Sequence, residues 1–166
     1  MAKELNVGDK APDLELVDDS SGNLRLADLK GQAVALYFYP QDDTETCTAE
    51  AIAVNALRSK FEAAGARIVG VSPDSVVSHQ RFKKKHRLGF PLAADESRQA
   101  IEAYGVWRQK TLFGRTYMGV ERSTFLIGAD GRIARVWRKV RAKGHAEAVL
   151  EAVKALAAPK STSARR

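Results

Sequence analysis

A short apolar run at residues 33–39 constrains the fold of this chain more than any other feature of its sequence. The run reads Ala-Val-Ala-Leu-Tyr-Phe-Tyr, contains almost no polar alternation, and ends at Pro40. Such a pattern is typical of a strand that lies inside a sheet and is covered on both faces. Because sheets of this kind occur mainly in α/β proteins, the run predicts an α/β domain.

Helical and strand patterns alternate after this run. We expect, in chain order, a helix over 48–61 that stops near Gly65, a strand over 67–72, helices over 75–86 and 96–104, a hairpin of strands 122–127 and 132–137, and a helix over 144–156. The first part of this order predicts parallel strands joined by helical crossovers. The whole is the thioredoxin-like order, a central mixed sheet flanked by helices, here with an N-terminal extension.

Length and composition fit a single domain. The chain has 166 residues, of which 45% are hydrophobic and 28% charged, so neither disorder nor a disulfide scaffold is expected. We expect one domain over residues 1–157, followed by a basic tail over 158–166. The N-terminus has no apolar signal region, and no later run is long enough for a membrane span, so we expect neither export nor membrane insertion.

The chain contains one cysteine, Cys47. One cysteine cannot form an intrachain disulfide or a structural zinc site, so we expect a reducing compartment, the cytoplasm. Cys47 is then either a buried apolar residue or a reactive thiol, and composition does not choose between the two.

The formal net charge of +7 would suit an acidic partner. Basic runs occur at 81–87 and 132–143, but no nucleic-acid motif accompanies them, so we interpret both as solvated faces and expect no nucleic-acid partner. His79, His86 and His145 lie in charged helical or turn contexts, and we expect all three to be solvated.

The position of Cys47 favours reactivity. It follows the central strand at the first turn of the next helix, where unpaired N–H groups and the helix dipole lower the pKa of a thiol. Pro40 would end the strand and shield the thiolate, and the Thr44 hydroxyl could donate to the sulfur or to a bound oxygen. Glu45 and Glu50 would oppose a thiolate unless a cation offsets them.

Topology supplies a candidate for this cation. A hairpin strand antiparallel to residues 33–39 must begin beside the end of that strand, and Arg122 begins it. Its guanidinium could hold both the thiolate and a peroxide oxygen. The alternative is an ordinary surface arginine.

The spacing Pro40-x-x-x-Thr44-x-x-Cys47 resembles the active-site signature of the peroxiredoxins, and the residues from Tyr37 to Thr44 resemble the peroxiredoxin Q, or bacterioferritin comigratory protein, subgroup. The likeness extends over residues 5–157. It implies a thiol peroxidase that reduces hydrogen peroxide or small organic hydroperoxides without metal, haem, flavin or nicotinamide. Cys47 would form a sulfenic acid, Thr44 and Arg122 would orient the peroxide, and Pro40 would shield the site.

Two departures from the family pattern are visible. Glu45-Thr46 stands where the family usually has Pro-Gly, and the places of a resolving cysteine hold Ile52 and Lys83. The chain therefore resembles a one-cysteine member, a monomer or at most a weak dimer, whose sulfenic acid is reduced by an external thiol. Thioredoxin, a glutaredoxin with glutathione, or another small thiol would serve. The rival interpretation is a redox sensor or binding module of the same fold with little turnover.

Overall fold

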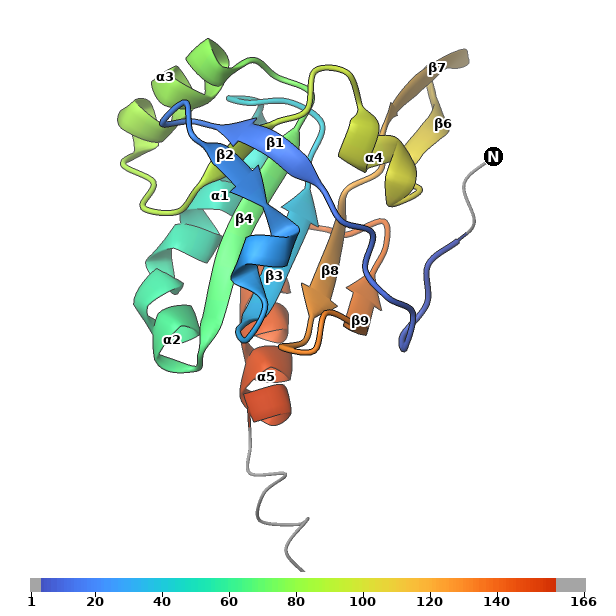
Figure 1. Ribbon diagram of the computed structural model, residues 1–166. Helices are drawn as coiled ribbons and strands as arrows, with labels where there is room; N and C mark the ends of the chain where they lie inside the picture. Colours follow the sequence, from blue (N-terminus) through green and yellow to red (C-terminus); the bar gives the residue numbers. More distant parts are fainter. Residues whose placement is uncertain (1–3, 158–166) are drawn as a thin grey trace, which may run out of the picture.

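The computed structural model describes residues 4–157, so the expected tail over 158–166 lies outside the described residues. Figure 1 shows the arrangement of the elements. They are β1 (Glu15–Asp18), β2 (Asn23–Arg25), the 3-10 helix η1 (Leu26–Leu29), β3 (Ala33–Phe38), α1 (Glu45–Ala56), α2 (Arg58–Ala63), β4 (Ala66–Ser72), α3 (Val76–His86), β5 (Leu92–Ala94), α4 (Gln99–Ala103), β6 (Trp107–Leu112), β7 (Arg115–Val120), β8 (Ser123–Ile127), β9 (Ile133–Trp137) and α5 (His145–Ala157).

The predicted α/β class and mixed sheet are confirmed. Among the described residues, seven strands form one sheet in the order β2-β1-β5-β4-β3-β8-β9. The β3–β4 and β4–β5 pairs are parallel and joined by helices, whereas β8 runs antiparallel to both β3 and β9. The predicted crossovers and the predicted hairpin are therefore both present.

Some elements differ from the sequence prediction. The single helix expected over 48–61 is two helices, α1 and α2, separated at Leu57. The short strands β1, β2 and β5 and the β6–β7 hairpin were not predicted from the sequence. Most residues of β6 and β7 are exposed or only partly buried, so the hairpin carries no apolar alternation that would mark it.

The central strand β3 supports two cores. Val34, Leu36 and Phe38 belong to one apolar cluster, and the alternate residues Ala35 and Tyr37 belong to the other. This is the period of two that a strand covered on both faces requires. One cluster is completed by residues of β1, α4 and the N-terminal segment, and the other by residues of α1, α2, α3 and α5.

The register of the sheet fixes what lies at the carboxyl end of β3. Phe38 pairs with Ser123, so Arg122 comes next to the end of β3, as topology predicted. Helix α1 begins after the same end, and the loop after β4 lies beside it. On β4, a Cβ at Gly70 would come within 3.0 Å of the Tyr37 ring, so glycine allows this ring to pack across the sheet.

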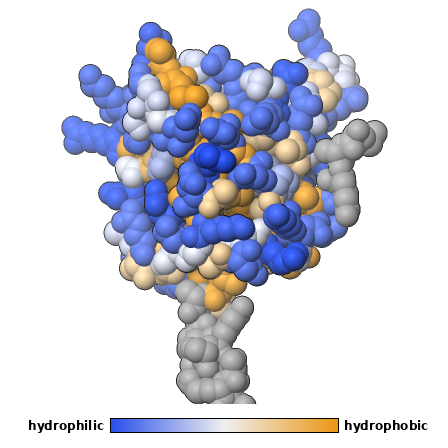
Figure 2. Space-filling view, in the orientation of Figure 1, coloured by the Kyte–Doolittle hydropathy of each residue, from blue (hydrophilic) through white to orange (hydrophobic). Residues whose placement is uncertain are grey.

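The surface is mainly polar on the face shown in Figure 2, with smaller hydrophobic areas between hydrophilic side chains. In the basic run 81–87, Phe82 packs inward while Arg81, Lys84 and Lys85 are exposed or partly exposed. No helix within residues 4–157 has both the length and the apolar character needed to cross a membrane.

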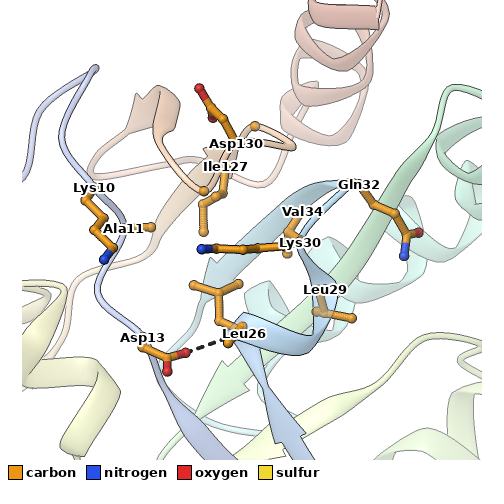
Figure 3. Close-up of a pocket in the computed structure, with 13 residues that line it drawn as sticks. Lys10, Ala11, Asp13, Leu26, Leu29, Lys30, Gln32, Val34, Ile127 and Asp130 are labelled. Atoms are coloured by element: carbon orange, nitrogen blue, oxygen red, sulfur yellow. Dashed lines mark hydrogen bonds between the residues drawn. The ribbon is translucent and has the colours of Figure 1, made fainter.

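A cavity of about 230 Å³ lies at the amino end of β3 (Figure 3). Val34 and Ile127 line it together with Leu26 of η1 and residues of the N-terminal segment. It is at the opposite end of β3 from Cys47, so it does not belong to the site described next.

Candidate active site

Cys47 lies in the first turn of α1, as the sequence predicted. Thr44 is the N-cap of this helix, and Cys47 is its third residue. The side chain is buried, with an exposed fraction of 2%. The sulfur therefore lies at the N-terminus of α1, the position expected from the sequence.

Arg122 lies between the thiol and a buried carboxylate. Its Nη2 donates to Cys47 Sγ at 3.3 Å, and its Nη1 donates to Glu50 Oε1 at 2.6 Å. Only 12% of the Arg122 side chain is exposed. The cation that the sequence required to offset the acidic neighbours of the thiol is therefore Arg122, and it is not an ordinary surface arginine.

Glu50 is the residue of this group that sequence reasoning misjudged, because it was treated only as a charge opposing the thiolate. It stands three residues after Cys47 on the same helix, a spacing that places two side chains on one face and could have identified it. Burial raises the pKa of Glu50 to about 7, although Arg122 opposes that shift. Its second oxygen, Oε2, is buried and has no hydrogen-bond partner among the described residues.

Thr44 and Pro40 complete the predicted set. The Thr44 hydroxyl donates to the Gln41 carbonyl oxygen at 3.1 Å and not to the sulfur, which was one of the two acceptors expected from the sequence. Pro40 follows β3 and lines an open hollow together with Arg122. The structure thus brings Cys47 and Arg122 into contact, with Pro40 at the hollow beside Arg122 and Thr44 at the start of the helix.

The residues that replace the family's usual ones have clear environments. Glu45 is an exposed first residue of α1, where water screens its charge and the helix dipole favours an anion. Ile52 is exposed on α1. Lys83, on α3, forms an ion pair with Asp19 at 2.8 Å. The place aligned with a resolving cysteine therefore holds a side chain that ties α3 to the residue following β1.

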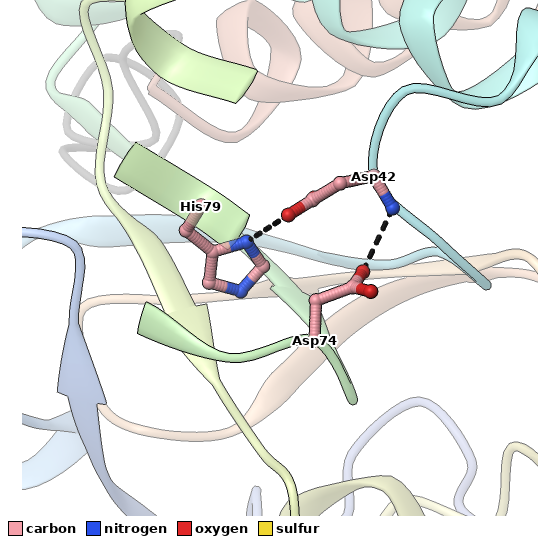
Figure 4. A group of neighbouring side chains, drawn as sticks. All are labelled: Asp42, Asp74 and His79. Atoms are coloured by element: carbon pink, nitrogen blue, oxygen red, sulfur yellow. Dashed lines mark hydrogen bonds and ion pairs between the residues drawn. The ribbon is translucent and has the colours of Figure 1, made fainter. Parts of the chain in front are cut away.

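A second polar group lies under the loop between β3 and α1 (Figure 4). His79 Nδ1 is 2.7 Å from Asp42 Oδ2, and its Nε2 is 3.0 Å from the Ala93 carbonyl oxygen. Tyr39 and Ser78 donate their hydroxyls to the same carboxylate at 2.6 and 2.8 Å. Asp74 accepts the backbone N–H of Asp42 at 2.7 Å. This network ties the loop to α3 and to the turn after β4.

Asp42, Asp74 and His79 each offer one possible metal-ligand atom, and these three atoms lie within 4.8 Å of one another. Both ring nitrogens of His79 already face protein oxygens, and the Asp74 oxygen accepts from both Asp42 and Ser72. His79 is also completely buried. We therefore interpret the group as a hydrogen-bonded support of the loop and assign no metal to it.

The prediction that the three histidines are solvated is wrong for His79 and His145. Both are buried, because each packs in the apolar layer between a helix and the sheet and bonds a polar partner there. His145 Nε2 lies 2.8 Å from Thr124 Oγ1, and burial lowers the pKa of His145 to about 4. His86 is only 17% exposed and contacts Asp43 in the loop before α1 at 3.2 Å.

Comparisons with known proteins agree with this geometry. The model of the AhpC/TSA family matches residues 7–136. Peroxiredoxin Bcp of Bacillus subtilis is 46% identical over 150 residues, which cover 90% of this chain and 96% of that protein. The protein named putative peroxiredoxin bcp in Coxiella burnetii is 46% identical over 146 residues, covering 88% of this chain and 97% of its own.

Solved structures agree as well. The peroxiredoxin Q of Xanthomonas campestris has a TM-score of 0.85 at 41% identity, covering 92% of this chain and 97% of that one. The C47S mutant of Xylella fastidiosa PrxQ has a TM-score of 0.88 at 39% identity, covering 93% and 98%. The expected thioredoxin-like fold and cysteine-based peroxidase class are thereby confirmed. The chain belongs to the AhpC/TSA family, within its peroxiredoxin Q, or Bcp, group.

Proposed function

We propose that this chain reduces hydroperoxides with Cys47 as the attacking thiolate and Arg122 as the cation that stabilises the reacting oxygens. The observation that carries the proposal is the contact of 3.3 Å between Arg122 Nη2 and Cys47 Sγ at the N-terminus of α1. A thiolate held there by a partly buried guanidinium would be both charged and close to a cation that can bind a peroxide oxygen.

The chemistry follows from this placement. The Cys47 thiolate attacks the terminal oxygen of the hydroperoxide, an S–O bond forms, and the O–O bond breaks. The sulfur is oxidised by two electrons to a sulfenic acid, and the leaving oxygen takes up a proton from water and departs as water or an alcohol. Arg122 favours the negative charge that develops on the leaving oxygen.

Pro40 and Thr44 have supporting roles in this proposal. Pro40 limits the access of water to the site at the edge of the hollow beside Arg122. Thr44 occupies the N-cap position of α1 without a side-chain capping bond, and rotation of its hydroxyl away from the Gln41 carbonyl oxygen would let it bond to a bound peroxide. Glu50 holds the guanidinium in place through Nη1, the terminal nitrogen that does not contact the sulfur.

Small organic hydroperoxides belong to the proposed substrates together with hydrogen peroxide. Solved structures of the bacterioferritin comigratory protein of Xanthomonas campestris address its alkyl peroxide reduction activity, and that chain is 40% identical to this one. Because Cys47 is the only cysteine in the sequence, we propose that an external thiol reduces the sulfenic acid. A cytoplasmic location, where such thiols are abundant, fits this requirement.

The deciding experiment is stopped-flow mixing of reduced protein with hydrogen peroxide, compared with the Cys47→Ser variant. We expect the wild type to consume one equivalent quickly and the variant to consume none, because a serine hydroxyl is not ionised at neutral pH. Circular dichroism would check that the variant keeps the fold. Consumption of peroxide by a folded Cys47→Ser variant would overturn the proposal.

A mass measurement separates a peroxidase from the rival redox sensor. One equivalent of peroxide without thiol should add one oxygen to Cys47, and excess peroxide should add two and then three. With thiol present, the peroxidase should consume many equivalents of peroxide. A protein that gains one oxygen and is not returned to the thiol by any of the proposed reductants would instead be a sensor.

A further inference from the structure

The hollow beside the active site carries a charge pattern that the peroxide reaction does not use. It has a volume of about 450 Å³, and its lining includes both Pro40 and Arg122. The rest of the lining comes from the β6–β7 hairpin and from the segment after β9: Arg108, Gln109, Lys110, Thr111, Tyr117, Glu121, Lys139 and Val140. A hollow of this size accepts a small molecule.

Four cationic side chains line this hollow, against the single carboxylate of Glu121. Arg122 is occupied by Glu50 and Cys47, and Arg108 donates to the Gly105 carbonyl oxygen at 2.9 Å. Within residues 4–157, Lys110 and Lys139 form no ion pair. The hollow therefore has two ammonium groups available to an anion.

Of the two lysines, Lys110 gives the stronger indication that the hollow binds an anion. It is only partly exposed, and burial together with the nearby Arg122 lowers the pKa of its ammonium group. A cation that is partly desolvated beside a second cation is stabilised when an anion binds between them. The hollow thus favours a negatively charged ligand.

The place of the hollow indicates what the rest of this ligand does. Arg122 lines the hollow and contacts Cys47, which is itself buried, so a molecule anchored at the lysines lies beside the guanidinium that contacts the sulfur. The sequence offers no second cysteine, so each turnover requires a thiol from outside the chain. One ligand class satisfies both observations, a thiol that carries a negative charge.

We propose that the hollow binds a small carboxylate-bearing thiol, held by Lys110 and Lys139, which reduces the oxidised Cys47. This inference rests on the proposed function and names the class of its reductant. A hydroperoxide that carries a carboxylate would satisfy the same lysines, and the experiment below separates the two sources of the anion.

The reaction balances with two thiols. The first thiolate attacks Cys47 Sγ, an S–S bond forms, the S–O bond breaks, and the oxygen leaves as water after taking up a proton. The second thiolate attacks the sulfur of the bound thiol and releases the Cys47 thiolate. Two small thiols are thereby oxidised to a disulfide, and the two electrons they lose are those that the peroxide gained.

The test compares thiols of different charge on preformed sulfenic acid. The protein is oxidised with one equivalent of hydrogen peroxide and then mixed with 3-mercaptopropionate, which is anionic, or 2-mercaptoethanol, which is neutral. The ratio of the two rate constants is measured in the wild type and in the double variant Lys110→Met/Lys139→Met. Intrinsic differences between the thiols cancel when the two proteins are compared.

We expect the anionic-to-neutral ratio to be at least tenfold higher in the wild type than in the double variant, and to fall with added salt. The matched control is Lys60→Met/Lys84→Met, which removes two exposed lysines on α2 and α3 and should keep the wild-type ratio. Equal ratios in the wild type and in Lys110→Met/Lys139→Met would overturn the inference. The oxidation step is compared in the same way, with cumene hydroperoxide as the neutral substrate and a carboxylate-bearing hydroperoxide as the anionic one. If the lysines favour the anionic reagent in this step alone, and not in the reaction with thiols, the inference is also overturned.

A binding measurement keeps the inference testable if the peroxidase proposal fails. Reduced protein is titrated with 3-(methylthio)propionate, which cannot react, and followed by amide NMR. We expect saturable shifts at Lys110 and Lys139 that are absent from the double variant. No saturable shift would overturn the inference, whereas a failure of Cys47 to form a sulfenic acid would overturn only the proposed function.

Discussion

The side-chain pairs Arg122–Glu50 and His79–Asp42 both lie largely buried near the carboxyl end of β3, but their polar atoms are bonded to different extents. Both oxygens of Asp42 accept hydrogen bonds, and both ring nitrogens of His79 have oxygen partners. In contrast, Glu50 Oε2 has no partner among the described residues, and Arg122 divides its donors between Glu50 and Cys47.

This difference indicates that the His79–Asp42 pair holds the structure, whereas the Arg122–Glu50 pair can change its bonding. A completely bonded buried network holds one geometry, because any change leaves a polar atom unpaired at a cost. An incompletely bonded pair can exchange partners, and the raised pKa of Glu50 lets its charge change near neutral pH. We infer that His79–Asp42 fixes the loop that carries Thr44, while Arg122–Glu50 adjusts the charge beside the sulfur.

The largest expected effect comes from breaking the completely bonded pair. Asp42→Asn keeps the size of the side chain but removes the charge that faces His79, and should lower the free energy of unfolding by about 3 to 5 kcal/mol. Urea unfolding at pH 7 measures this. Asp28→Asn, which changes an exposed aspartate on η1, is the control and should leave the unfolding midpoint nearly unchanged. A loss of less than about 1 kcal/mol for Asp42→Asn would remove the network's structural role.

The next effect concerns the reactive pair. Arg122→Met keeps the apolar part of the side chain and removes the donors to Cys47 and Glu50. The reaction with peroxide should slow by more than tenfold, which corresponds to a loss of at least ~1.4 kcal/mol of transition-state stabilisation. Stopped-flow oxidation measures it, with the exposed Arg67→Met on β4 as control. A change below twofold would show that Arg122 does not act on the reacting oxygens.

The sequence predicted Cys47 and Arg122 better than it predicted the His79–Asp42 network, for physical reasons. Cys47 and Arg122 were predicted because each stands at the start of an element, α1 or β8, whose position beside the end of β3 follows from the apolar pattern. Glu50 was identified as near the thiol, but its bond to Arg122 depends on side-chain rotamers that spacing does not specify. His79 was predicted as solvated because its neighbours in the chain are polar, whereas its burial depends on how α3 packs on β3 and β5.

The elements predicted least well were those with little apolar pattern. The hairpin of β6 and β7 is largely exposed, and its turn is formed by Phe113 and Gly114, both with positive φ. A β-hairpin turn of this kind is recognisable only when asparagine or glycine occupies both places, and here a phenylalanine occupies one. The hollow proposed for the thiol is therefore the part of the site least accessible to sequence reasoning.

The smallest expected effect is a change in the pH dependence of stability on Glu50→Gln. The pKa of Glu50 is about 7 in the folded protein, whereas that of an unburied glutamate is 4.5. Between pH 4.5 and 7 the folded state therefore holds a proton that the unfolded state has released. Stability from this group is therefore present at low pH and is lost as the pH rises toward 7. Over pH 6 to 8 the loss amounts to about 1 kcal/mol.

Glutamine does not titrate, so Glu50→Gln should remove this decline. The difference in unfolding free energy between the wild type and the variant, measured by urea unfolding at pH 6, 7 and 8, should fall by about 1 kcal/mol across the range. Glu147→Gln, which removes an exposed glutamate on α5, controls for the loss of one carboxylate. A pH-independent difference for Glu50→Gln would mean that Arg122 keeps Glu50 ionised throughout. The Arg122–Glu50 pair would then keep one charge state over this range, and its difference from His79–Asp42 would concern hydrogen-bond geometry alone.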